Sequence, residues 1–91
     1  MLILITYDIQ NDRTRARLAN KLKDFGPRVQ YSVFEADVTD YEYQRLLKKM
    51  DKVKLGNDDS IRVYRICGDC VKHIKIWGVG EVTKDRDFYI A

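Results

Sequence analysis

Asp8 is the residue best placed to do chemistry, because it lies near the end of the apolar run over residues 2–9, directly before a polar stretch. An ionised carboxylate among aliphatic neighbours is costly unless a cation or hydrogen bonds compensate its charge. A metal ion would do so, since Mg²⁺ takes oxygen ligands and is usually held by one or two carboxylates together with water and substrate phosphate. Asp8 could instead cap the following helix or pair with Arg15. The residues alone leave these interpretations open.

Three arginines, Arg15, Arg17 and Arg28, are the candidate phosphate ligands. A planar guanidinium can donate two parallel hydrogen bonds to a phosphate, which suits arginine better than lysine. The net charge is only +3, from 17 basic and 14 acidic side chains, so the composition permits a phosphate-rich partner without demanding one. A solvated helix face is the alternative, above all for Arg17, which lies off the apolar stripe of its predicted helix.

Cys67, Cys70 and His73 form a second group of possible ligands. A structural zinc site needs four ligands, and one cysteine pair supplies only half of such a set. Two cysteines also do not make the disulfide framework of a small secreted domain. We therefore expect neither metal binding nor redox chemistry at this pair. Nothing in the sequence brings His73, the only histidine, close to Asp8.

The element that must position Asp8 is a buried strand over residues 2–9. Alternate residues of a strand lie on opposite faces, which places Asp8 with Leu4 and Thr6, and Tyr7 on the other side. Both faces are largely apolar, so each of them needs a cover.

A helix is predicted at about residues 12–25, where apolar residues recur at helical spacing. Asn11 or Asp12 can cap its start, since either side chain accepts from the unpaired amides of the first turn. Gly26 can take the left-handed conformation that often ends a helix, and Pro27 cannot continue the helix.

Strands and a second helix follow. Residues 28–38 are rich in strand formers with a broken alternation, which indicates one bent strand or two short ones. The capping-box pattern at 39–42 predicts a helix over residues 40–51, and residues 60–66 read as a strand. Beyond it we expect a turn at 67–70 and a strand around 74–77.

These elements predict an α+β sandwich in a single domain over residues 1–91, with 80–91 as a tail that adds an edge strand through residues 88–90. Two helices can cover only one face of a sheet of four or five strands, so a second copy of the chain is the economical cover for the other face. The sequence shows no signal peptide and no apolar run long enough to span a membrane. We therefore expect a cytoplasmic protein without a membrane partner.

The chain resembles the CRISPR-associated endoribonuclease family, the smaller of the two core proteins of spacer acquisition. The likeness rests on four runs: Ile5-Thr6-Tyr7-Asp8-Ile9, Arg15-Ala16-Arg17-Leu18, Gly26-Pro27-Arg28-Val29-Gln30-Tyr31-Ser32-Val33-Phe34-Glu35 and Asp59-Ser60-Ile61-Arg62-Val63-Tyr64. It extends from residue 1 to about residue 78. The resemblance implies a ferredoxin-like βαββαβ fold with an additional C-terminal strand, in a two-fold homodimer.

The resemblance also implies an endonuclease that depends on Mg²⁺, with Mn²⁺ as a possible substitute, and whose metal carboxylate matches Asp8. Members differ in cutting single-stranded RNA or double-stranded DNA. Positions with the family's residue type that would bind nucleic acid or support the site are Tyr7, Arg15, Arg17, Arg28 and Phe34. Aromatic residues at strand positions, such as Tyr7 and Phe34, usually pack in the core. We therefore expect Phe34 to contribute to the site only indirectly.

Two other functions stay open at this point. Some members of the family bridge dimers of the larger adaptation integrase, so the chain could be a non-catalytic, nucleic-acid-binding scaffold in which Asp8 is structural. A toxin-type ribonuclease of related fold is the other alternative. The resemblance does not decide between RNA and DNA as the substrate.

Overall fold

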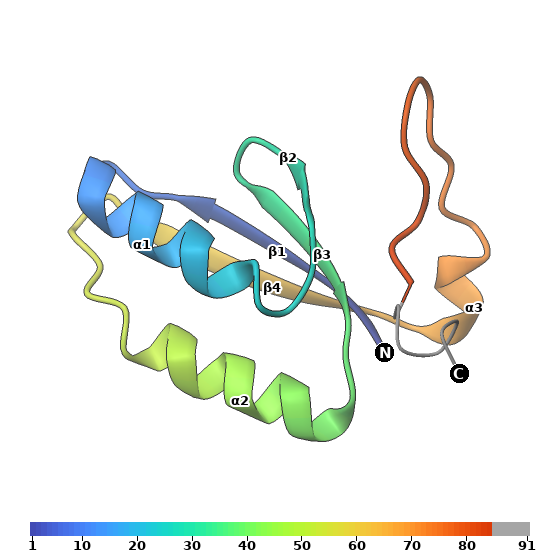
Figure 1. The fold of residues 1–91 in the computed structure, drawn as a ribbon, viewed down its shortest axis with the longest axis horizontal. Helices are drawn as coiled ribbons and strands as arrows, with labels where there is room; N and C mark the ends of the chain where they lie inside the picture. Colours follow the sequence, from blue (N-terminus) through green and yellow to red (C-terminus); the bar gives the residue numbers. More distant parts are fainter. Residues whose placement is uncertain (85–91) are drawn as a thin grey trace.

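The structure, a computed structural model, describes residues 1–84. A four-stranded antiparallel sheet has the strand order β2-β3-β1-β4, and helices α1 and α2 both lie on one face of it (Figure 1). The elements are, in chain order, β1 (Leu2–Asp8), α1 (Asp12–Leu22), β2 (Arg28–Gln30), β3 (Val33–Asp37), α2 (Asp40–Asp51), β4 (Ser60–Ile66) and α3 (Gly68–Val71). This is the expected ferredoxin-like βαββαβ arrangement.

The central strand β1 divides its side chains between the two faces of the sheet. Ile3, Ile5 and Tyr7 point to the helices and are buried. They form one core with residues of β3 and of both helices, among them Phe34, Ala36, Leu18, Leu22 and Leu46. Burying one such aliphatic or aromatic side chain is worth about 1.5–3 kcal/mol, so this core is the main source of stability.

Helix α1 begins as expected and ends earlier than expected. The Asn11 side chain is the cap and accepts from the Thr14 amide at 3.0 Å. The prediction that Gly26 takes a left-handed conformation is wrong, because the glycines with positive φ among residues 1–84 are Gly78 and Gly80. Gly26 is needed for space instead: a Cβ there would lie 2.0 Å from the Glu35 carbonyl oxygen. The glycine therefore lets the end of α1 approach β3 closely.

Helix α2 has the bounds that its capping box predicted. The Thr39 hydroxyl accepts from the Glu42 amide at 3.1 Å, and the Glu42 carboxylate accepts from the Thr39 amide at 3.0 Å. Residues 28–38 supply two strands, β2 and β3, which resolves the alternative left open by the sequence. They are joined at Tyr31 and Ser32 by a tight turn that contains no glycine.

The segment after β4 differs from the prediction. The expected turn contains the short helix α3, and residues 74–77 form no strand. The alternation of Ile74 and Ile76 fits a strand, but strand formation also needs a neighbouring strand to pair with. The segment returns to its own sheet at Thr83, whose amide and hydroxyl donate to Glu35 at 3.3 and 2.9 Å. The expected edge strand at 88–90 lies outside the described residues.

In the part of the chain that the structure describes, no helix is both long and apolar enough to cross a bilayer.

Candidate nucleic-acid and metal site

The Asp8 carboxylate lies on the face of the sheet that the helices leave open. Asp8 is the last residue of β1, is exposed, and stands opposite Ser60 in the register with β4. Neither structural alternative for it is realised, because Asn11 caps α1 and Arg15 pairs with Asp12. Among residues 1–84 the Asp8 side chain has no hydrogen bond or ion pair. Both of its oxygens are therefore available to a cation.

Asp59 fixes the loop that follows β1. Its carboxylate accepts from the Gln10 amide at 2.9 Å and from the Gly56 amide at 2.8 Å. These hydrogen bonds from backbone amides favour the ionised form and lower the pKa of Asp59. Because Gln10 lies two residues after Asp8, the contact helps to set where β1 ends. The sequence analysis missed this role, although an acid three residues after Gly56 in a polar loop is a typical source of such a local hydrogen bond.

Arg15 holds the same loop from the helix side. Its guanidinium donates to the carbonyl oxygen of Ile9 at 2.8 Å and forms an ion pair with Asp12. The hydrogen bond from Arg15 to Asp12 is the main reason why the pKa of Arg15 is raised, and the Tyr31 hydroxyl also raises it. The alternative in which Arg15 pairs with Asp8 is therefore not realised. Arg15 is partly committed to its own loop, with its side chain 28% exposed.

A stack of three side chains lies on the helix-covered face of the sheet and consists of Tyr7, Phe34 and Arg28. The Tyr7 and Phe34 rings are 6.3 Å apart with an interplanar angle of 28°. The Arg28 guanidinium lies over the Phe34 ring at 5.4 Å from its centroid. Phe34 is fully buried at 0% exposure, so its ring is out of reach of a ligand. It supports Arg28 from below.

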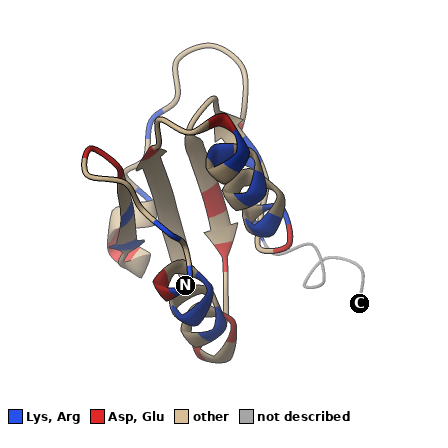
Figure 2. Cartoon of the chain, turned by 90° about the vertical axis from the view of Figure 1, so that its left-hand side faces the viewer, with Lys and Arg blue, Asp and Glu red and all other residues tan. Residues whose placement is uncertain are grey.

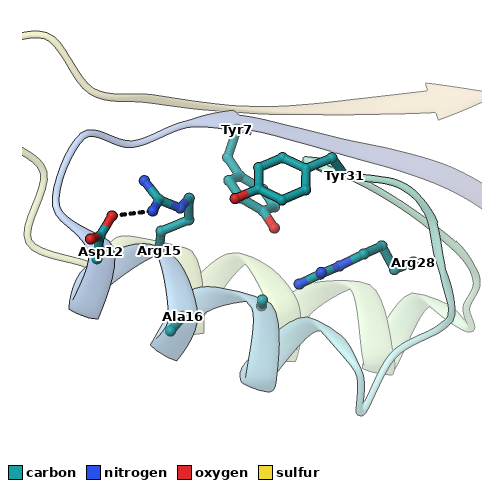
Figure 3. Close-up of a pocket in the computed structure, with 7 residues that line it drawn as sticks. Tyr7, Asp12, Arg15, Ala16, Arg28 and Tyr31 are labelled. Carbon is teal, nitrogen blue, oxygen red and sulfur yellow. Dashed lines mark hydrogen bonds and ion pairs between the residues drawn. The ribbon is translucent and has the colours of Figure 1, made fainter.

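A pocket of about 230 Å³ opens above this stack, between α1 and the β2–β3 turn (Figure 3). Its lining residues are Tyr7, Asp12, Arg15, Ala16, Ala19, Arg28 and Tyr31. In Figure 3 the side chain of Arg28 reaches across the pocket toward α1, and the Tyr31 ring lies beside Tyr7 with its hydroxyl directed toward Arg15. Tyr31 was not among the expected site residues, although it lies in one of the four runs that carry the family resemblance and is an aromatic side chain in a predicted strand region.

The structure thus separates the six expected site residues. Asp8 is on the open face of the sheet, whereas Tyr7, Arg15 and Arg28 line the pocket on the helix-covered face. Arg17 is exposed on α1 and does not line this pocket. Lys and Arg positions occur along both α1 and α2 (Figure 2). Phosphate ligands are therefore available on the helices, away from Asp8.

Asp8 fits a magnesium ion as one ligand of an incomplete site. Within residues 1–84 no three His, Cys, Asp or Glu side chains gather in a way that could hold a metal ion. A single free carboxylate can still serve Mg²⁺, which accepts one or two carboxylates and completes its six oxygens with water and phosphate. A second Asp8 from another copy of the chain would supply the second carboxylate.

Cys67 and Cys70 are free and exposed. The Cys67 sulfur accepts from the Cys70 amide at 3.2 Å, and its hydrogen bonds with Cys70 lower the pKa of the Cys67 thiol.

The fold is a ferredoxin-like βαββαβ domain, and comparison with known proteins shows its family. Residues 1–74 match the family model described as CRISPR associated protein Cas2, and the chain belongs to this family. The CRISPR-associated endoribonuclease Cas2 3 of Synechocystis sp. is 39% identical over 83 residues, which are 91% of this chain and 90% of the relative.

Two solved structures are similar as well. A hypothetical protein from Thermus thermophilus has a TM-score of 0.72 and 34% identity, and the match covers 89% of this chain and 94% of that one. A chain of a partial Cas6-RT-Cas1–Cas2 complex has a TM-score of 0.58 and 34% identity, with 82% of this chain and 88% of that chain covered.

Proposed function

We propose that this protein is a Mg²⁺-dependent endonuclease that acts in CRISPR spacer acquisition as a homodimer, together with dimers of the adaptation integrase. The observation that carries the proposal is the Asp8 carboxylate, which is exposed at the end of a rigid central strand and is engaged by no other described residue. The endoribonuclease name of the relatives and the Cas1–Cas2 complex among the similar structures point the same way.

Four residues have separate roles in the proposed nuclease. Asp8 from each of two copies would hold Mg²⁺, which when bound supplies charge neutralisation at the phosphate and acidifies a water molecule. Asp59 and Arg15 hold the loop after β1 from its two sides, and so keep Asp8 in place. Arg17 on α1 provides a phosphate contact that carries no sequence information, as backbone contacts do.

The dimer would form through the open face of the sheet. Leu4, Thr6 and Val33 on this face are only partly buried in the single chain, and the ring of Tyr64 is 45% exposed. Unpaired apolar surface of this kind marks an interaction site. The same face carries Asp8, so a two-fold axis across it would bring the two carboxylates toward each other. Light scattering at micromolar concentration should give the mass of two chains, and a stable monomer would refute this part.

The decisive experiment compares wild type, Asp8→Asn and the control Asp24→Asn, which changes an exposed acid in the turn after α1. Magnesium is titrated by calorimetry, and cleavage is assayed on single-stranded RNA and double-stranded DNA beside it. Asp8→Asn should abolish both metal binding and cleavage without unfolding the domain, because it removes the charge and keeps the shape. Asp24→Asn should change neither. Equal cleavage by all three proteins would refute the role of Asp8.

A non-catalytic scaffold is the second candidate, and the single acid per chain favours it. A site with one carboxylate depends wholly on the second copy, and no further metal-ligating cluster exists among residues 1–84. The same Asp8→Asn variant separates the two functions when spacer acquisition is measured in cells. Loss of cleavage with acquisition intact would assign the biological role to the scaffold.

A further inference from the structure

The pocket between α1 and the β2–β3 turn is not explained by the proposed nuclease site. It opens on the helix-covered face, so β1 separates it from Asp8. A dimer formed through the open face of the sheet would leave it accessible. We propose that this pocket binds one unpaired nucleotide, with the base stacked on Tyr31 and the phosphate held by Arg28 and Arg15.

Tyr31 is exposed at the rim of the pocket. Its side chain is 73% exposed although it lines a pocket whose other aromatic member, Tyr7, is buried. Tyr31 therefore contributes little to the core. An exposed ring at the rim of a pocket offers a face on which a base can stack, and base stacking on aromatic side chains tolerates every sequence, since each base has a π-face.

The pocket has more basic than acidic side chains in its lining. Its charged lining residues are Arg15, Arg28 and Asp12. Asp12 pairs with Arg15, whereas Arg28 has no acidic partner among residues 1–84 and lies over the Phe34 ring. The pocket thus keeps an uncompensated guanidinium that is held in position from below. Arg28 is the principal phosphate ligand, and Arg15, whose donors are partly used by Ile9 and Asp12, is the secondary one.

The pocket is small. The pocket volume of about 230 Å³ is below the roughly 300–1,000 Å³ of pockets that enclose drug-sized ligands. It is therefore too small to enclose a whole nucleotide, so the phosphate would lie inside it near Arg28 and the base outside it, on the exposed ring of Tyr31. A duplex cannot enter, because its bases are already stacked and their faces are not available to Tyr31. The ligand is either a free mononucleotide or one unpaired nucleotide of a longer chain, and the two have the same chemistry at the pocket.

This inference rests on the proposed function only in taking nucleic acid as the natural ligand, and its test needs no cleavage. Adenosine 5′-monophosphate is titrated into the full chain without divalent metal, and binding is measured from the NMR chemical shifts of the protein. Adenosine and inorganic phosphate are titrated separately. A single-stranded tetra-adenylate and a blunt duplex complete the set. The monophosphate should bind more tightly than either of its halves, and the blunt duplex should not compete with it. Binding of the tetra-adenylate would identify a strand as the source of the nucleotide, and its failure to bind would identify a free mononucleotide.

Each variant has a matched control. Tyr31→Ala should weaken binding of the monophosphate by about 5- to 100-fold, the range of base stacking on an aromatic side chain, whereas Tyr31→Phe should keep the affinity. The control is Tyr41→Ala, because Tyr41 is 74% exposed on α2, away from the pocket. Arg28→Ala should weaken binding by about 10- to 100-fold through loss of a charged donor. Its control is Arg45→Ala, since Arg45 lies over the Phe25 ring at 5.7 Å in the same manner.

The results separate this inference from the proposed nuclease. Asp8→Asn should leave binding of the monophosphate unchanged, because Asp8 lies on the other face of β1. Intact binding with no cleavage by wild type would refute the nuclease and keep the nucleotide pocket. If Tyr31→Ala leaves the affinity for the monophosphate unchanged, the inference is overturned. Equal affinities for adenosine and the monophosphate would overturn it too. Absence of any binding at millimolar concentration would overturn it as well.

Discussion

Replacing Phe34 by alanine should destabilise the domain strongly, and any loss of cleavage should follow from that. Phe34 is fully buried, stacks with Tyr7 and supports the Arg28 guanidinium. Truncating a buried phenylalanine to alanine costs about 3–5 kcal/mol. The whole free energy of unfolding of such a domain is about 5–15 kcal/mol. One kcal/mol lowers the melting temperature of a domain of this size by roughly 4–8 °C, so the expected drop is about 12–40 °C.

The variant Phe34→Leu tests whether Phe34 acts by packing in the core or takes a direct part in cleavage. Leucine keeps most of the apolar volume, so the loss should be near 2 kcal/mol, from about 0.8 kcal/mol for each missing carbon. Urea unfolding followed by circular dichroism measures both variants. Phe25→Ala serves as the control, because Phe25 also lies beneath cationic side chains but is only half-buried. It should cost less than Phe34→Ala.

Cleavage is then assayed at a temperature at which each variant is folded. If Phe34 acts only by packing, Phe34→Leu should keep most of the activity, and Phe34→Ala should recover activity on cooling. A Phe34→Leu protein that is stable but inactive would refute the packing argument and assign the ring to the reaction itself. A Phe34→Ala protein as stable as wild type would show that the reasoning about the core is wrong.

Three further predictions can be tested on the same protein. Arg17→Ala should weaken binding to all nucleic-acid sequences and reduce the slope of log affinity against log salt by about one unit, and an unchanged slope would mean that Arg17 is merely solvated. Gly26→Ala should destabilise the fold or prevent it, because its Cβ would meet the Glu35 carbonyl, and a normal melting temperature would contradict this. Asp59 has a lowered pKa in the folded state, so its contribution to stability is present at neutral pH and is lost as the pH falls below about 4. Urea unfolding of wild type and Asp59→Asn should therefore differ most at neutral pH and converge in acid, and a constant difference would exclude this origin.

Much of the fold followed from local signals in the sequence. The capping box at Thr39 and Glu42 predicted the start of α2, and the choice of Asn11 or Asp12 as cap predicted the start of α1. The alternation along β1 was enough to place Asp8 and Tyr7 on opposite faces of the sheet, and the structure has Tyr7 buried under the helices and Asp8 exposed. These features depend on residues that are close in the chain, and capping and strand alternation act over that range.

The tertiary structure decided what depends on distant residues. The sequence allowed residues 74–77 to be a strand, but strand formation needs a neighbour to pair with, and none is formed there. It suggested a conformational role for Gly26, whereas the reason for this glycine is the close approach of β3. The sequence allowed Arg15 to pair with Asp8, but in the folded chain Arg15 donates to the Ile9 carbonyl and pairs with Asp12.

The site itself shows the same division. The sequence identified Asp8 and the arginines by residue type, because carboxylates and guanidinium groups have few uses beside a buried strand. It did not single out Tyr31 or Asp59, although both lie in runs that carry the family resemblance. Tyr31 becomes a candidate only when the turn between β2 and β3 places it beside Arg15 and Arg28, and Asp59 only when the folded chain brings it to the Gln10 amide. Arg15 and Tyr31 are 16 residues apart and Gln10 and Asp59 are 49 apart, so only the packed fold could bring each pair together.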